Sequence, residues 1–269
     1  MKQIFNPPDW LLQWNRALAG ETNDRFEQVV PRQHQKAYQY AETINQVLAD
    51  ARSDDVAAPT VAQLFYHLVR EEVVTHTVQS QSMLRKLITT GLHWGLIDWD
   101  YISDVNMTVY DALQPQRVAS GRHVEVWVEK PGFEAVLQPI CLTYGLTWRV
   151  LRGRPTACDI YTFCNQMREY DRVHVVYLCD LDPVAEATLA FIHEQLESFD
   201  DQRVVIERAA LTEQQIHELT LPANPVSVTA HGVQDYLDRY GTTQWELEAL
   251  SPAELAKIVD DQLSVHLLG

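Results

Sequence analysis

Carboxylates follow two short hydrophobic runs in this sequence. Glu129 comes directly after residues 124–128, and Asp180 and Asp182 come shortly after residues 173–178. Both runs are rich in β-branched and aromatic side chains, as buried parallel strands are, so the acids would meet at the carboxyl edge of one sheet. Three carboxylates repel one another unless a cation lies among them, and hard oxygen ligands suit Mg²⁺. The pattern therefore predicts a magnesium site of the kind used in phosphate chemistry.

The D-x-D pair also fits a purely structural role. Asp182 precedes Pro183 and a helix-compatible segment, and an aspartate in that position commonly caps the helix. Glu129 favours the metal site, because it too follows a strand-like run and precedes a helix-compatible segment at 133–144, as a βαβ unit requires.

Strand and helix patterns alternate in this half of the chain, which predicts an α/β fold with a parallel sheet and helices on both faces. The expected strands are 124–128, 147–151, 173–178 and 203–206, and the expected helices are 133–144, 156–169 and 184–199. Three more helices are expected. A short one begins near Thr212, and the other two cover 233–240 and 252–263.

Residues 59–104 are predicted to form a helix, a turn, a second helix and a short strand. The first helix begins after Thr60, and its apolar residues form one stripe: Val61, Leu64, Phe65, Leu68 and Val69. Tyr66 lies about 130° from the centre of that stripe, so its hydroxyl should be exposed. Residues 96–105 are expected to supply the small strand of a wing.

The second helix, at 79–92, has the pattern of a recognition helix. We expect it to bury Met83, Leu84, Leu87 and Ile88, with a polar face that carries Arg85, Lys86, Thr89 and His93. Arg85, Lys86 and His93 are then candidate DNA contacts.

Four segments follow from these patterns. Residues 1–30 form an arm with two tryptophans, and 31–106 form a helical winged-helix domain whose first helix covers 31–52. Residues 107–122 lack periodicity and contain Pro115 and Gly121, so we assign them to a linker. Residues 123–269 form the α/β domain with a C-terminal helical extension.

A glutamate in an E-K-P context, followed about fifty residues later by D-x-D, resembles the Toprim domain of topoisomerases and primases. The stretches DLDP, LRGRPT and YLDRYGTTQWELEALSP resemble more narrowly the A subunit of topoisomerase VI, its meiotic double-strand-break relatives and small stand-alone versions on mobile elements. The resemblance covers roughly residues 58–260. It implies a winged-helix domain followed by a Rossmann-like Toprim domain, and a homodimer that cuts both DNA strands.

The resemblance also implies roles for individual residues. Tyr66, in QLFYH, would attack DNA and form a 5′-phosphotyrosyl link, while Glu129, Asp180 and Asp182 would hold Mg²⁺. No Gly-rich ATP-binding pattern is present, so any ATPase subunit would be a separate polypeptide. An ordinary surface tyrosine remains the alternative for Tyr66. Glu246 and Glu248, in WELEAL, are either structural or outer metal ligands.

Basic residues gather at one predicted strand end, where Arg149, Arg152 and Arg154 surround Gly153. Arg149 is a candidate DNA contact, and Arg152 or Arg154 would clamp the phosphate at the site. A solvated basic turn is the alternative for this cluster. Gly153 would let the backbone approach a phosphate closely.

The overall charge opposes DNA binding, because 37 acidic and 21 basic residues give a formal charge of −16. Most of the basic residues are arginines, however, which bind phosphate well when gathered in one groove. The four cysteines show no C-x-x-C spacing, and no leader-like or membrane-spanning run occurs. We expect a cytoplasmic protein with reduced thiols and no membrane association.

Three functions fit these patterns. The leading hypothesis is a Mg²⁺-dependent DNA-cleaving transesterase similar to the topoisomerase VI A subunit. A Toprim nuclease that uses water in place of Tyr66 is the first alternative. A non-catalytic DNA-binding or complex-assembly subunit is the second.

Overall fold

The computed structural model describes residues 44, 45, 48, 49, 58–93, 97, 99–112, 121–199, 201–226 and 233–268. The chain divides into two compact units, Met1–Asp104 and Val105–Gly269, and each is described by itself. The predicted arm at 1–30 lies outside the described residues. Of the helix expected at 31–52 only four residues are described; all four are helical, and Ile44 and Leu48 are buried.

Helix α4 (Val61–Arg70) begins at a capping box. The Thr60 side chain accepts a hydrogen bond from the Gln63 backbone N–H at 3.1 Å, and Gln63 Oε1 accepts one from the Thr60 N–H at 2.9 Å. The predicted stripe is confirmed for the residues that α4 buries: Val61, Leu64, Phe65 and Leu68.

Helix α5 (Val78–His93) extends one residue beyond the predicted helix at each end. Its buried face is formed by Leu84, Ile88 and Leu92, four residues apart, whereas Met83 is 39% exposed and Leu87 is half-buried. The prediction was therefore right for Leu84 and Ile88 and wrong for Met83. The buried row of residues, spaced four apart, begins at Leu84 and not at Met83.

The wing strand expected at 96–105 is absent from the residues described there. Trp99–Tyr101 form a 3₁₀ turn, η1, and the chain after it is extended without a strand partner. The Ser103 N–H donates to the Pro59 carbonyl at 3.0 Å, so this segment is held by the entrance to α4 and not by a hairpin.

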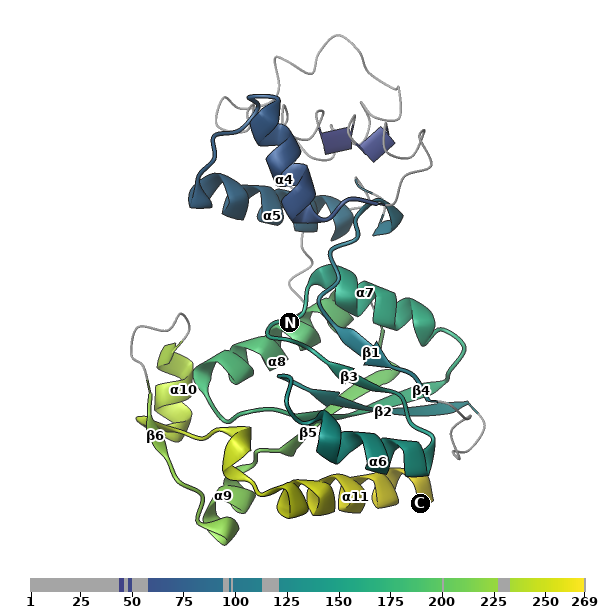
Figure 1. Cartoon of the computed structure of the whole chain (residues 1–269), viewed down its shortest axis with the longest axis vertical. Coiled ribbons are helices and arrows are strands. Elements are labelled where there is room, and N and C mark those ends of the chain that lie inside the picture. Colours follow the sequence, from purple (N-terminus) through teal and green to yellow (C-terminus); the bar gives the residue numbers. More distant parts are fainter. Residues whose placement is uncertain are drawn as a thin grey trace. The chain divides into compact units, whose positions relative to one another are not determined.

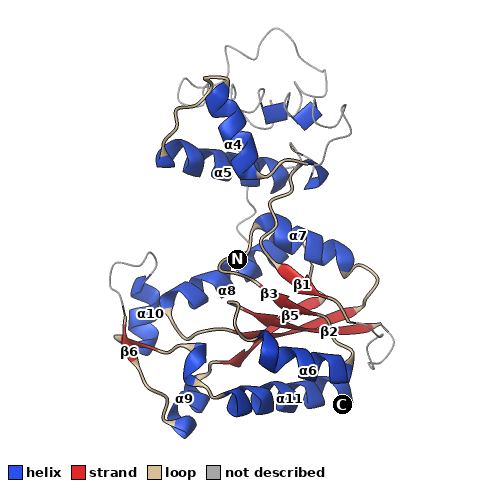
Figure 2. Cartoon of the chain, viewed as in Figure 1, coloured by secondary structure: helices blue, strands red, loops and turns tan. Residues whose placement is uncertain are grey.

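The second unit is built on a five-stranded sheet, drawn in red in Figure 2. Its strand order is β1-β3-β2-β4-β5. Strands β2 to β5 are parallel, and β1 is antiparallel to β3. Their bounds are β1 (Thr108–Tyr110), β2 (Arg122–Val128), β3 (Trp148–Val150), β4 (Arg172–Leu178) and β5 (Val204–Ala210). The predicted α/β class with a parallel sheet is confirmed.

Strand β1 corrects the assignment of residues 107–122 to a linker. Thr108 pairs with Val150 and Tyr110 pairs with Trp148, and the two aromatic rings stack with centroids 4.0 Å apart. Three residues are too few to show periodicity, so the cross-strand ring pair, not the local pattern, determines this strand. Residues 113–120 lie outside the described part.

Helices cover both faces of the sheet (Figure 1). Helices α6 (Glu134–Tyr144) and α11 (Pro252–Leu268) pack together on one face, and α7 (Ala157–Gln166) and α8 (Pro183–Ser198) pack together on the other. Smaller elements follow β5: α9 (Glu213–Leu219), β6 (Asn224–Pro225), α10 (Val233–Tyr240), β7 (Thr243–Gln244) and η2 (Leu247–Ala249). No helix in the described ranges is long and apolar enough to cross a membrane.

The strand order reverses direction between β2 and β4, which makes this a topological switch point. From β2 the chain passes through α6 to β3 on one side, and from β3 it returns through α7 to β4 on the other side and then through α8 to β5. The segments leaving β2 and β4 therefore turn to opposite faces of the sheet. Ligands of open α/β sheets bind at such switch points, outside the carboxyl ends of the strands.

Candidate metal centre

Two of the expected acids lie together at this switch point. Glu129 is the first residue after β2, and its N–H donates to the Leu178 carbonyl at the end of β4 at 3.0 Å. The Asp180 N–H in turn donates to Glu129 Oε2 at 3.1 Å. Both side chains are buried, with 8% of Glu129 and 5% of Asp180 exposed. The parallel pairing of β2 and β4 is what brings these two side chains to one edge.

A distant segment joins them through a short antiparallel bridge. The Leu181 N–H donates to the Trp245 carbonyl at 2.9 Å, and the Trp245 N–H donates to the Leu181 carbonyl at 3.0 Å. The Leu247 N–H then donates to Asp180 Oδ1 at 2.7 Å. This bridge brings Glu246 and Glu248 beside Asp180.

Lys130 lies at the centre of these carboxylates. Its Nζ is 2.9 Å from Asp180 Oδ2, 2.9 Å from Glu246 Oε2 and 2.7 Å from Glu248 Oε2. The carboxylate oxygens of Asp180, Glu246 and Glu248 lie within 4.8 Å of one another. The group therefore shares only Asp180 with the expected trio of Glu129, Asp180 and Asp182.

Burial and like charge raise the pKa values of the inner acids. Burial, reinforced by the charge of Asp180, raises the pKa of Glu129 to about 7. Burial also raises the pKa of Asp180 to about 6, although the Leu247 N–H and the Lys130 ammonium oppose the rise. Burial lowers the pKa of Lys130, but its three carboxylate partners outweigh that effect and raise it overall.

Asp182 has the structural role that its position also suggested. Its Oδ1 accepts a hydrogen bond from the Ala185 N–H at 2.6 Å, so Asp182 caps α8, with Pro183 in the first turn. Burial raises the pKa of Asp182, although the N–H groups at the helix start oppose the rise. A capping carboxylate has a second oxygen, so the cap leaves one oxygen for a cation.

Arg152 and Arg154 are exposed in the loop after β3, beside the acids. The Gly153 N–H donates to the Glu129 carbonyl at 3.2 Å, which holds this loop against the end of β2. Gly153 has φ of +96°, a conformation that favours glycine, and a Cβ there would meet nothing within 4 Å. The Arg154 guanidinium lies 4.0 Å above the Phe191 ring of α8.

Arg149 is not the solvent-facing DNA contact that we expected. It is 3% exposed, and its guanidinium pairs with buried Glu125 through Nε to Oε2 at 2.7 Å and Nη2 to Oε1 at 3.1 Å. Nη2 also donates to Gln166 Oε1 at 2.8 Å. Arg149 lies in the middle of β3, where side chains alternate between the two covered faces, so its side chain points beneath α7 and not towards the loop.

In the first unit Tyr66 is 58% exposed, which confirms the predicted exposure of its side chain. Its ring lies 5.5 Å from that of His76, centroid to centroid. Arg85 and Lys86 are exposed on α5, and Arg85 Nη1 is 3.5 Å from Asp104 Oδ2. The backbone of His93 belongs to α5, but its side chain lies outside the described part.

Sequence reasoning missed Lys130 as a site residue. The signal was present, because Lys130 follows Glu129 directly in the E-K-P stretch. Successive residues at a strand end face different sides, so adjacency did not indicate that the ammonium would turn towards Asp180. Glu246 and Glu248, left open between a structural and a ligand role, join the carboxylate group.

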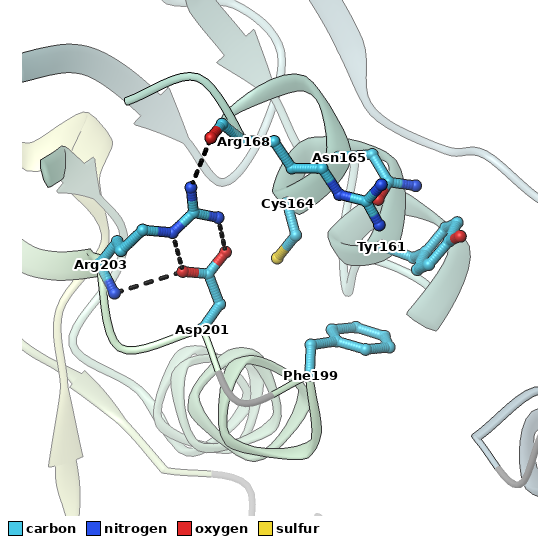
Figure 3. A pocket seen from close by; sticks show the side chains of 7 residues that line it. All are labelled: Tyr161, Cys164, Asn165, Arg168, Phe199, Asp201 and Arg203. Carbon is cyan, nitrogen blue, oxygen red and sulfur yellow. Dashed lines mark hydrogen bonds and ion pairs between the residues drawn. The ribbon is translucent and has the colours of Figure 1, made fainter. Parts of the chain in front are cut away.

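A separate pocket, shown in Figure 3, lies where β5 begins. This is the amino end of the strand, whereas the acids lie at the carboxyl ends of β2 and β4. It is lined by Tyr161, Cys164, Asn165, Arg168, Phe199, Asp201 and Arg203. Arg203 is tied to Asp201 at 2.8 Å and to three backbone carbonyls that follow α7. Burial raises the pKa of the Cys164 thiol to about 12, which leaves it unreactive.

We call Glu129, Lys130, Asp180, Glu246 and Glu248 the edge cluster. Its possible metal ligands are carboxylate oxygens, and Lys130 is its one basic member among the described residues. With its four carboxylates ionised and Lys130 protonated, the edge cluster carries a net charge of −3. Such a charge attracts a divalent cation from solvent. Neither protein-family models nor curated proteins match the sequence.

Proposed function

We propose that this chain is a Mg²⁺-dependent DNA-cleaving transesterase similar to the A subunit of topoisomerase VI. The observation that carries the proposal is the edge cluster at the switch point between β2 and β4. We also propose that the described α4 and α5 belong to a winged-helix domain and that the parallel sheet is a Toprim domain.

The edge cluster fits Mg²⁺ on chemical grounds. Three carboxylates share the Lys130 ammonium, their one cationic partner among the residues that the structure describes, so a position for positive charge already exists among them. All the ligand atoms are hard oxygens, and partial exposure of Glu246 and Glu248 leaves room for the waters that Mg²⁺ retains. Asp180 and Glu129 would hold the ion, with Glu246, Glu248 and the second oxygen of Asp182 completing the acidic shell.

Bound Mg²⁺ would stabilise negative charge on the phosphate and on the departing 3′-oxygen. Arg152 and Arg154, exposed in the loop held to Glu129, would bind the same phosphate and orient it. The acids, through the ion, and the arginines would then act on the same phosphodiester.

Tyr66 would supply the nucleophile. Its oxygen forms a bond to phosphorus, the bond between phosphorus and the 3′-oxygen breaks, and the 3′-oxygen takes up a proton as a 3′-hydroxyl. His76, whose ring centroid lies 5.5 Å from that of Tyr66, would accept the phenol proton. The product is a 5′-phosphotyrosyl link.

The protein would work as a homodimer on DNA, with exposed Arg85 and Lys86 contacting the backbone and any ATPase subunit supplied as a separate chain. In this arrangement the tyrosine of one protomer meets the edge cluster of its partner, so two strands are cut by two composite sites.

The test is covalent trapping on DNA labelled at the 5′ or 3′ end, with Mg²⁺, denaturation and peptide mapping. The parent should leave label attached to Tyr66, and Tyr66→Phe should lose both cleavage and attachment while keeping its fold and DNA affinity. Tyr101→Phe, which removes a hydroxyl from another tyrosine of the same unit, is the matched control. Asp180→Asn should bind Mg²⁺ far more weakly than the parent, and Asp235→Asn, on the exposed side of α10, should not.

A nuclease that uses water is the second candidate, favoured because every member of the edge cluster comes from the second unit, without Tyr66. Cleavage by Tyr66→Phe equal to that of the parent, with free ends, would establish this candidate instead. Absence of cleavage with any metal or DNA form would move the non-catalytic subunit to first place.

A further inference from the structure

A second cluster of potential ligands joins the sheet to the C-terminal helix. His174 on β4, Glu207 on β5 and His266 on α11 meet on the face that α11 covers. The Nε2 atoms of His174 and His266 lie 2.9 Å and 3.3 Å from the same atom, Glu207 Oε2. We call these three residues the clasp cluster.

The clasp cluster is remote from the edge cluster. His174 precedes Asp180 by six residues of extended chain, a separation of about 20 Å at about 3.3 Å per residue. His174 lies opposite Val205 and Val176 lies opposite Glu207, so the two ligands come from staggered positions on neighbouring strands. The proposed DNA chemistry uses none of these residues.

The Nε2 atoms of His174 and His266 lack hydrogen bonds among the described residues. Both Nε2 atoms are buried from solvent, and within the described part of the chain neither has a hydrogen-bond partner of acceptable geometry, despite the nearby carboxylate. Buried polar atoms normally have partners, so two orphaned nitrogens aimed at one oxygen require an explanation. A metal ion bound by all three groups would provide one.

We propose that His174, Glu207 and His266 form a Zn²⁺ site that fastens α11 to the sheet. Two imidazoles and one carboxylate are a donor set that Zn²⁺ takes, with Zn–N and Zn–O distances near 2.0–2.2 Å. Tetrahedral geometry at those lengths separates the ligand atoms by about 3.4 Å. The observed contacts of 2.9 Å and 3.3 Å are close to that value, and all three ligand atoms lie within 4.8 Å of one another.

Binding requires one rearrangement. The imidazole rings stack with centroids 3.6 Å apart and an interplanar angle of 28°. They must tilt apart to converge on one ion. His266 lies in the last turn of α11, where helix geometry adjusts readily, and the Glu207 side chain is 42% exposed, which leaves a path for the ion and for a fourth ligand from water.

The site would secure the far end of α11. The start of this helix follows Leu247, whose N–H is held by Asp180, and its middle is tied through Asp260, which accepts from the Tyr144 hydroxyl at 2.6 Å. The clasp cluster would add a third attachment near residue 266. Zn²⁺ should therefore stabilise α11 more than the rest of the unit.

Isothermal titration of the metal-stripped protein with ZnCl₂, in excess Mg²⁺ to occupy the edge cluster, tests the proposal. The parent should bind one equivalent of Zn²⁺, and Glu207→Gln and His266→Gln should each weaken binding by more than about 100-fold, since losing a ligand exceeds losing an outer-shell partner. His193→Gln, at an exposed histidine on α8, is the matched control. Hydrogen exchange in 258–268 should slow when Zn²⁺ is added to the parent and not to Glu207→Gln.

Circular dichroism of each variant without metal separates lost binding from lost folding, and isosteric Glu207→Gln is the variant expected to keep the fold. Titration with Co²⁺ provides a spectroscopic readout, because tetrahedral nitrogen and oxygen ligation gives visible absorption bands. No Zn²⁺ binding by the parent, or equal binding by parent and Glu207→Gln, would overturn the proposal. Loss of Zn²⁺ binding in Asp180→Asn alone would assign the ion to the edge cluster and overturn it equally.

Discussion

Substitution of Arg149 can test whether this residue serves in a buried ion pair with Glu125 and not in DNA contact. In Arg149→Met a side chain of similar length replaces the guanidinium and leaves Glu125, which is fully buried, without its cation. Glu125 keeps hydrogen bonds from His123 at 3.1 Å and Trp127 at 2.9 Å, but loses two from Arg149. Breaking a buried pair in this way costs about 3 to 5 kcal/mol.

The pH dependence gives a second quantity, the free energy that all the partners of Glu125 together supply to its ionised form. Burial works against ionisation of Glu125, but His123 and Arg149 outweigh it and lower the pKa from 4.5 to about 2. A folded-state pKa below the unfolded value stabilises the protein above pH 4.5, and that stability is lost as pH falls towards 2. At about 1.4 kcal/mol per unit the difference is about 3 kcal/mol.

The assay is thermal unfolding followed by circular dichroism between pH 2 and pH 7. At neutral pH Arg149→Met should lower Tm by about 6 to 20 °C, because 1 kcal/mol moves Tm by about 2 to 4 °C in a unit of this size. Without the guanidinium, burial should raise the pKa of Glu125, so stability between pH 4 and pH 7 should fall as pH rises.

Two controls make the result specific. Arg172→Met, at an exposed position at the start of β4, should change stability by less than about 0.5 kcal/mol. Glu125→Gln combined with Arg149→Met removes both charges and should recover part of the loss. A variant Arg149→Met with the stability of the parent and weakened DNA binding would refute the burial argument and restore the DNA role.

Three further changes test the edge cluster and the DNA surface. Lys130→Met should lower Tm in the presence of EDTA, since three carboxylates lose their shared ammonium, and added MgCl₂ should raise Tm more than in the parent; equal responses would separate Lys130 from the metal site. Asp182→Ala should cost about 1 kcal/mol by removing the cap of α8, whereas Asp182→Asn should retain the cap; equal losses would contradict the capping role. Charge reversal at Arg85 and Arg152 should weaken DNA binding and reduce its salt dependence, measured by fluorescence anisotropy between 50 and 200 mM salt; unchanged slopes would place the DNA surface elsewhere.

The alternation of strands and helices was predictable because each element carries its own signal. The β-branched runs gave β2 and β4, and Thr156 and Thr212 begin α7 and α9 through capping boxes, which depend on residues three positions apart. Such local patterns determine local structure, so the predicted bounds differ from the observed ones by one or two residues in most elements.

What sequence reasoning missed depends on contacts between distant residues. Strand β1 exists because Tyr110 stacks on Trp148, and Arg149 turns inward because Glu125 lies on the neighbouring strand. The Lys130 position depends on Asp180, fifty residues later. The spacing of residues in a single sequence does not indicate any of these pairs. The sequence therefore predicted which strand ends carry the site, but not the ion pairs within it.

The bridge between Leu181 and Trp245 sets an order of events during synthesis. Glu246 leaves the ribosome 66 residues after Asp180, a delay of about 3 to 13 s at about 5 to 20 residues per second. During that interval Lys130 can already neutralise Asp180, so the sheet can form before the remaining carboxylates arrive. The nascent chain therefore carries only part of the edge cluster until the C-terminal segment has docked.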